Sequence, residues 1–229
     1  MLAYHATTRQ FAKFDINKTF KDSFFGSGFY FSDSMNDCIT NYRDEKGPDN
    51  KSKIFELVDQ MQDCAFDDEE ELTEEECIQR ATKIVIGDAP QLLVCELLMD
   101  NPAIMSRYGK NSYVELWQYD DDDEECAPTS KIYDYLIDAG LEEIWESIAI
   151  DGEMPITQLF NIICGGFYHL KDEGIDIYGV FIDILSIAGY DGIIMDKPYE
   201  FFGRMPDCGE KHYFLIDPDR VKILERIAL

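Results

Sequence analysis

Two short stretches near the start of the chain, YHATT at residues 4–8 and GSGFYFS at residues 26–32, decide which fold the sequence predicts. Each is a short apolar run that carries one polar aromatic residue, His5 in the first and Tyr30 in the second. A polar aromatic inside a strand needs a partner or a ligand for its polar tip. Because a glycine-flanked turn separates the two runs, we predict two strands that line a cleft for a flat, polar ligand such as a nucleotide.

The composition predicts a folded and strongly acidic protein. The 229 residues are 45% hydrophobic, which is enough to bury a sizeable core in one domain. The formal net charge of −27 disfavours binding to nucleic acid and to anionic membrane surfaces, because like charges repel. Solubility, a basic protein partner and mimicry of nucleic acid remain as explanations of the charge.

Cysteine and histidine usage bears on the compartment and on metal sites. The seven cysteines are scattered and form no CxxC pair, which predicts reduced thiols in a cytoplasmic protein rather than a disulfide framework. The three histidines, at positions 5, 169 and 212, do not cluster. No metal site is therefore predicted.

No segment of the sequence reads as a signal or a membrane span. The chain begins in a strand-like stretch without a basic and then apolar leader, and no run reaches the roughly 18 apolar residues that a span needs. We expect a monomeric protein in the cytoplasm, or one delivered into a host cytosol without a cleavable signal peptide.

Periodicity predicts an α+β fold with strands at both ends and helices in the middle. Ser34, with Asp33, offers an N-cap for a helix that runs to about residue 42, and Thr73 with Glu76 resembles a capping box. Strands are expected at residues 2–8, 28–32, 91–99, 193–195, 212–216 and 221–227, and further helices at 54–61, 77–86, 131–140, 156–164 and 177–188. We expect one domain over residues 1–229, with a helical and acidic insertion at about 106–188, and terminal strands that build one sheet or two packed sheets.

Motifs in a fixed order resemble the ADP-ribosyltransferase superfamily. They are His5, the GFYFS strand at 28–32 followed by Tyr42, the GYDGI turn at 189–193, and HYFLIDP at 212–218. The chain looks closest to the branch of diphtheria toxin and the poly(ADP-ribose) polymerases, and within it to the small transferases of phage polyvalent proteins and bacterial effectors. The match covers about half of the chain, at residues 2–42, 91–105 and 189–224.

The resemblance implies a mono-ADP-ribosyltransferase that cleaves NAD, its co-substrate, and transfers ADP-ribose to a protein target. It implies a split sheet with NAD in a central cleft, where the segments around His5, Tyr30 and His212 meet. The residues implied at NAD are His5, the Ala6 backbone, Thr7, Tyr30, Ser32 and, as a stacking ring, Tyr42. Arg9 follows the first motif and either faces the pyrophosphate or lies in solvent.

Two positions depart from the family pattern. Ala6 stands where the family usually has glycine, and it is small enough to let a backbone approach a ring. His212 stands where the family has its catalytic glutamate, whose hydrogen bond to the 2′-hydroxyl stabilises an oxocarbenium-like state by about 2–4 kcal/mol. Glu210, two residues earlier, is expected on the same strand face, so Glu210 and His212 are both candidates for that contact.

The alternatives to these assignments are structural. His5 can be a core histidine whose polar groups are hydrogen-bonded within the protein, and Tyr30 and Tyr42 can be core rings.

If His212 has the catalytic role, activity is expected to fall on acidification, because protonation adds positive charge beside a cationic transition state. If neither Glu210 nor His212 acts, the fold is a degenerate transferase that serves as an acidic binding or inhibitor protein. Hydrolysis of NAD without transfer lies between these two functions.

Overall fold

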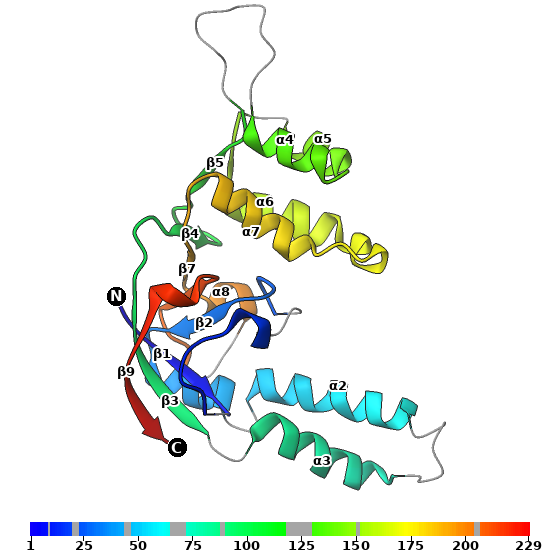
Figure 1. Cartoon of the computed structure of the whole chain (residues 1–229), viewed down its shortest axis with the longest axis vertical. Helices are drawn as coiled ribbons and strands as arrows, with labels where there is room; N and C mark the ends of the chain where they lie inside the picture. The colour runs from blue at the N-terminus through cyan, green and yellow to red at the C-terminus, as the bar shows by residue number, and fades with distance from the viewer. Residues whose placement is uncertain are drawn as a thin grey trace, which may run out of the picture.

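The computed structural model describes residues 1–8, 10–19, 23–43, 47–64, 72–87, 90–117, 130–149, 152–203 and 207–229. Within these ranges the fold is α+β, as predicted, and a seven-stranded mixed sheet forms its centre (Figure 1). The strand order is β4-β7-β8-β2-β1-β3-β9. None of the described helices has both the length and the apolar character that crossing a membrane requires.

The strands of this sheet come from three parts of the chain: residues 2–32, 91–106 and 193–228. Only β4 and β7 run parallel; every other neighbouring pair is antiparallel. Short β5 and β6 form a separate two-stranded sheet. The strands are β1 (Leu2–Thr7), β2 (Phe29–Ser32), β3 (Gln91–Leu97), β4 (Ala103–Ser106), β5 (Tyr113–Glu115), β6 (Glu153–Pro155), β7 (Ile193–Asp196), β8 (Lys211–Leu215) and β9 (Val221–Ala228).

The sheet is joined most narrowly between β1 and β2. These strands pair through Tyr4 and Ser32 alone among the described residues, whereas β1 pairs with β3 along its whole length. The sheet therefore consists of two half-sheets, β4-β7-β8-β2 and β1-β3-β9, that meet at one register pair. The predicted N- and C-terminal strands share one sheet, with β3 lying between β1 and β9.

Short helices and a long helical hairpin follow the first two strands. Ser34 caps α1 (Met35–Asp37), which widens into a π-helix (Cys38–Arg43). The hairpin of α2 (Pro48–Cys64) and α3 (Glu74–Ile86) extends away from the sheet (Figure 1). Its predicted capping box of Thr73 and Glu76 is confirmed, and both groups satisfy helix N-terminal donors.

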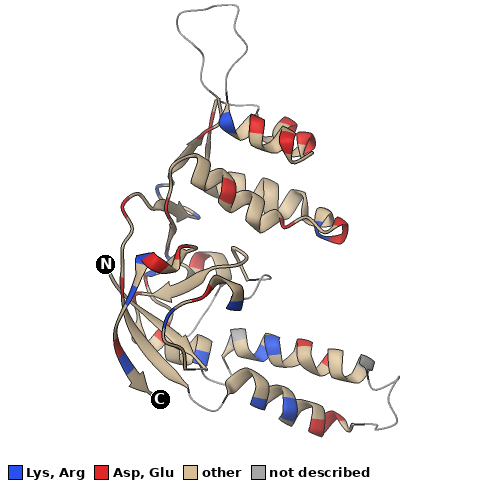
Figure 2. Ribbon diagram, in the orientation of Figure 1, with Lys and Arg blue, Asp and Glu red and all other residues tan. Residues whose placement is uncertain are grey.

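Most of the remaining helices pack against β4, β7 and β8 at one end of the sheet. They are α4 (Lys131–Asp138), α5 (Glu142–Ile148), α6 (Ile156–Phe160), which continues as a π-helical turn (Asn161–Gly166), α7 (Ile177–Ile187) and α8 (Tyr199–Phe202). Figure 2 shows carboxylates concentrated on α5 and at the start of α3, which fits a solvated acidic surface. The short helix α8 is not among the helices that the sequence pattern predicted.

The two faces of the sheet pack against different cores. Phe29 and Phe31 of β2 lie in one core with Phe14 and Leu93. Tyr30 points the other way and packs on Phe214, within the core built mainly from α4–α7. This alternation follows from the two-residue period of a strand. Ser32, two residues further along β2, therefore lies on the same face as Tyr30.

Candidate functional site

Asp37, which sequence reasoning did not single out, is the centre of a buried polar cluster. It is the last residue of α1 and has no exposed surface. Ser34 Oγ accepts a hydrogen bond from the Asp37 N–H at 3.2 Å, and this capping bond fixes the first helical turn after β2. The turn directs the carboxylate of Asp37 back against β2 and β8, where its partners lie.

Four groups donate hydrogen bonds to this carboxylate. Its Oδ2 accepts from Ser32 Oγ at 2.6 Å, from His212 Nε2 at 2.6 Å and from the Gly209 N–H at 3.2 Å. Its Oδ1 accepts from Asn41 Nδ2 at 2.7 Å. Burial raises the pKa of Asp37, but the bonds from His212, Ser32 and Asn41 outweigh it and hold the pKa below 3.8. Asp37 is therefore a buried anion at neutral pH.

The charge of Asp37 determines which ring nitrogen of His212 carries the hydrogen. An ionised carboxylate only accepts hydrogen bonds, so Nε2 of His212 carries the hydrogen between them. No described residue provides a hydrogen-bond partner for the other ring nitrogen, Nδ1. The rings of Tyr42 and Phe202 flank the imidazole, with centroids 5.9 and 6.2 Å away. His212 thus has one nitrogen committed to Asp37 and a second that can accept a proton.

The segment before β8 is held tightly against this cluster. Asp207 has a left-handed backbone with φ of 55°, and Thr40 Oγ1 donates to its carboxylate at 3.1 Å. At Gly209 a Cβ atom would collide with Asp33 Oδ1 and Ser32 Oγ. Glycine is therefore needed at 209 so that its N–H can approach Asp37.

Asp37, Cys208 and His212 also place three possible metal-ligand atoms within 4.8 Å of one another. Two ligands of a tetrahedral zinc ion are about 3.3 Å apart, given bonds of about 2.0–2.1 Å. Asp37 Oδ2 and His212 Nε2 are 2.6 Å apart, which is a hydrogen-bond distance. Burial and the charge of Asp37 raise the pKa of Cys208 to about 12, so its thiol stays protonated. The group fits a hydrogen-bonded cluster better than a metal centre.

His5 lies in a different environment, on the opposite face of the sheet. Its Nδ1 is 2.7 Å from the carbonyl oxygen of Tyr30, so Nδ1 carries the hydrogen. Phe11, Phe14 and Phe31 surround its ring, with centroids 5.2–6.5 Å away. Burial, the larger effect, and the charge of Lys53 lower the pKa of His5. His5 is therefore neutral at pH 7 and has Nε2 as an acceptor.

The resemblance implies that the segments around His5, Tyr30 and His212 meet in one cleft, and the strand register places His5 on the other face from Tyr30 and His212. β1, β2 and β8 lie side by side, as that prediction requires. However, Tyr4 lies opposite Ser32, and Ser32 lies opposite His212, so these three side chains share a face. His5 follows Tyr4 and projects to the other face, because successive side chains of a strand alternate.

Tyr30 has a structural role at the turn before β2. Its hydroxyl accepts from the Phe25 N–H at 2.8 Å and donates to the Gly26 carbonyl oxygen at 3.1 Å. Its ring contacts Phe214 at 4.9 Å between centroids. The ring and the hydroxyl are both used inside the protein, which favours the core interpretation of Tyr30 over a place in the nicotinamide pocket.

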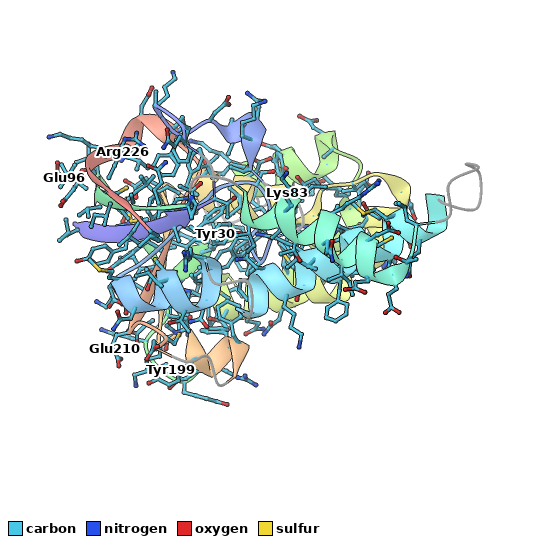
Figure 3. The ribbon with its side chains drawn as sticks, turned by 90° about the horizontal axis from the view of Figure 1, so that it is seen from below. Tyr30, Lys83, Glu96, Tyr199, Glu210 and Arg226 are labelled. Atoms are coloured by element: carbon cyan, nitrogen blue, oxygen red, sulfur yellow. The ribbon has the colours of Figure 1, made fainter. Side chains whose placement is uncertain are left out.

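Glu210 lies outside the Asp37 cluster. It precedes β8, which begins at Lys211, and its carbonyl oxygen accepts a hydrogen bond from the Lys197 N–H at 2.8 Å. Its side chain is exposed, and Figure 3 shows it at the edge of the molecule near Tyr199, far from the central Tyr30. Of the two catalytic candidates, only His212 belongs to the cluster.

The other predicted site residues are divided between the half-sheets. Ala6 and Thr7 pair with Leu92 and Gln91 of β3. Ser32 and Tyr42 belong to the His212 side, where Ser32 bonds Asp37 and Tyr42 contacts the imidazole. Arg9 lies outside the described residues.

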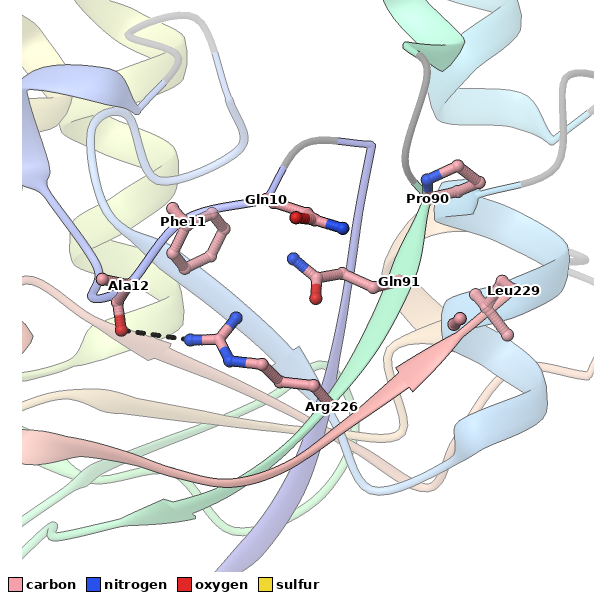
Figure 4. A pocket seen from close by; sticks show the side chains of 8 residues that line it. Gln10, Phe11, Ala12, Pro90, Gln91, Arg226 and Leu229 are labelled. Atoms are coloured by element: carbon pink, nitrogen blue, oxygen red, sulfur yellow. Dashed lines mark hydrogen bonds between the residues drawn. The ribbon is translucent and has the colours of Figure 1, made fainter.

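A groove opens on the His5 face of the β1-β3-β9 half-sheet (Figure 4). Arg226 opposes Leu93, which opposes His5, so the three form a row across the strands. The Arg226 guanidinium donates to the Ala12 carbonyl oxygen at 3.0 Å and lies 5.9 Å from the centre of the Phe11 ring. Phe11 therefore connects His5 to the groove. The lining residues are Gln10, Phe11, Ala12, Pro90, Gln91, Arg226, Ala228 and Leu229.

The chain matches no family model, no curated protein and no solved structure. The resemblance to ADP-ribosyltransferases therefore depends on the motifs themselves. Asp37 and Gly209 were missed because buried polar partners give no sequence period. The available signal was local: Ser34, Asp37 and Asn41 are spaced by three and four residues, which places a cap and two polar side chains on one helical face.

Proposed function

We propose that the chain is a mono-ADP-ribosyltransferase that cleaves NAD and transfers ADP-ribose to a protein target. The single observation that supports this most is the order β8-β2-β1 in the sheet. The three strands that carry the transferase-like motifs come from opposite ends of the chain, yet they are neighbours. The narrow join at Tyr4 and Ser32 also agrees with the split sheet that the resemblance implies.

The roles follow from the state of each side chain. Neutral His5 offers Nε2 as an acceptor for a ribose hydroxyl near the join. Tyr42 offers a ring for the nicotinamide beside His212. In this assignment NAD crosses the join, so that its ribose groups reach both faces of the sheet.

The chemistry requires negative charge close to the nicotinamide ribose. When the glycosidic C1′–N bond breaks, its electron pair stays with nicotinamide, which becomes neutral, and the ribose becomes oxocarbenium-like. The buried carboxylate of Asp37 lies one hydrogen bond behind His212. An anion held in a low-dielectric interior stabilises such a cation more strongly than one in water. His212 and Asp37 together thus replace the glutamate of the family.

The test is incubation of the protein with labelled NAD and a cell lysate. We expect a labelled protein band from the wild type and a loss of about 10²- to 10³-fold in His212→Asn. His169→Asn is the matched control, because His169 is exposed and lies between α6 and α7, in the helical part of the chain. Wild type that yields only free ADP-ribose would be an NAD glycohydrolase. Wild type that consumes no NAD contradicts the proposal.

The alternative is an acidic binding or inhibitor protein on a degenerate transferase fold. The net charge of −27 and the displacement of Glu210 from the cluster favour it. It predicts no consumption of NAD and binding to a basic protein that weakens steeply with salt. Titration calorimetry with NAD, at low and high salt, separates the two functions.

A further inference from the structure

We infer that Asp37 is a positioning residue that makes His212 the proton acceptor for the incoming nucleophile, an inference that rests on the proposed function. The superfamily pattern places one glutamate beside the ribose. In this chain a carboxylate and an imidazole from separate elements, Asp37 of α1 and His212 of β8, are coupled by a 2.6 Å hydrogen bond.

The surroundings of Asp37 hold its orientation. Ser32 and Gly209 bind the same oxygen as His212, while Asn41 binds the other oxygen. Rotation of the carboxylate would break several of these bonds at once, in an interior where unpaired donors are costly. The His212 Nε2–H is therefore held towards Asp37, and Nδ1 keeps its lone pair whenever the ring is neutral.

In the transfer step, His212 accepts the proton that the nucleophile of the target protein loses. The hydroxyl or amine of the target attacks C1′ with its lone pair, and the pair of the C1′–N bond leaves with nicotinamide. Nδ1 of His212 takes the proton that the nucleophile loses, and the resulting imidazolium forms an ion pair with Asp37. The proton then passes to solvent, which restores the neutral ring.

Ser32 and Asn41 hold Asp37 in place but do not themselves set the tautomer of His212. Ser32 Oγ and Asn41 Nδ2 each donate to the carboxylate, and His212 Nε2 bonds the carboxylate rather than either of them. Removing one of them leaves Asp37 ionised and bonded to His212. Only a change at Asp37 itself alters which nitrogen of His212 carries the hydrogen.

The first test reads the tautomer directly. The chain has only three histidines, so nitrogen-15 spectra of the imidazole groups are simple, and the His212→Asn variant assigns the His212 signals. We expect hydrogen on Nε2 and none on Nδ1 in the neutral ring of the wild type. Hydrogen on Nδ1 of the neutral wild-type ring overturns the inference, and this measurement needs no variant that must fold.

The second test compares Asp37→Asn with Asp183→Asn, after circular dichroism has established that both are folded. In Asp37→Asn the tautomers of His212 should become mixed or inverted, and kcat for labelled transfer should fall about 10²- to 10⁴-fold with KM for NAD changed less than about threefold. Asp183→Asn, which removes an exposed carboxylate that Tyr135 binds on α7, should keep the wild-type tautomer and the wild-type kcat. An unchanged tautomer or kcat in Asp37→Asn overturns this inference alone. Wild type without any turnover of NAD overturns the proposed function as well.

Discussion

His5 and His212 lie on strands of the same sheet with β2 between them, yet their surroundings have little in common. His212 donates to a buried anion that three further groups fix in place. His5 donates to a backbone carbonyl and is enclosed by phenylalanine rings. The same side chain is thus hydrogen-bonded to a carboxylate at one site and to a backbone carbonyl at the other. The hydrogen-bond partner of a histidine, more than the sequence motif around it, decides what chemistry the side chain can perform.

The largest difference between the two sites should appear in stability. Asp37→Ala removes the acceptor of four buried donors, and we expect it to lower the free energy of unfolding by about 3–5 kcal/mol. His5→Gln loses one bond to a backbone carbonyl and should cost about 1 kcal/mol. Urea denaturation measures both, with Asp59→Ala on the exposed face of α2 as the control. Equal losses at positions 37 and 5 would remove the distinction between the sites.

Part of the unfolding free energy lost in Asp37→Ala should come from the charge of Asp37. This part depends on pH, so a pH series distinguishes it from the rest. The folded-state pKa lies below 3.8, so the stability from ionisation is complete above pH 3.8 and disappears as pH falls through the folded-state value. The difference in unfolding free energy between wild type and Asp37→Asn should therefore be constant near pH 6–7 and shrink in acid. A difference that does not change down to pH 3 would mean that Asp37 is not held as an anion.

Binding of NAD should distinguish the tyrosine beside His212 from the tyrosine in the core. Tyr42→Ala should weaken binding about tenfold to a hundredfold, the usual cost of about 1–3 kcal/mol for losing an aromatic wall. Tyr30→Phe should leave the affinity unchanged, because its hydroxyl bonds Phe25 and Gly26 within the protein. Calorimetry on folded variants gives both values. Weaker binding only in Tyr30→Phe would return Tyr30 to the ligand site.

The smallest expected effect is the pH dependence that His5 contributes. Burial lowers its pKa below 6.5, so below pH 6.5 the unfolded chain binds a proton that the folded chain does not. Wild type should lose up to about 1.4 kcal/mol of stability per pH unit in that interval, until the folded-state pKa is reached. His5→Gln should remove this part of the slope between pH 6.5 and 5. An identical slope in both proteins would show that His5 titrates as in the unfolded chain.

Local sequence patterns predicted much of the secondary structure. The apolar strand at Gln91–Leu97, the Ser34 cap and the capping box before α3 all depend on neighbours along the chain. β4 and α5 were not predicted, because four residues are too few to establish a period and α5 has no side-chain cap. The π-helix after α1 also has no sequence signal, since it differs from an α-helix only in its bonding.

The sequence by itself determined that this protein is an acidic α+β chain with motif-bearing strands near both ends. Alternation within β2 also determined that Tyr30 and Ser32 share a face. The tertiary structure alone decided that His212 meets Asp37, 175 residues away, and that His5 projects to the opposite face. Strand period is local, whereas register and buried hydrogen-bond partners are set by which segments pack together. For that reason the sequence could name His212 but not the anion that defines its chemistry.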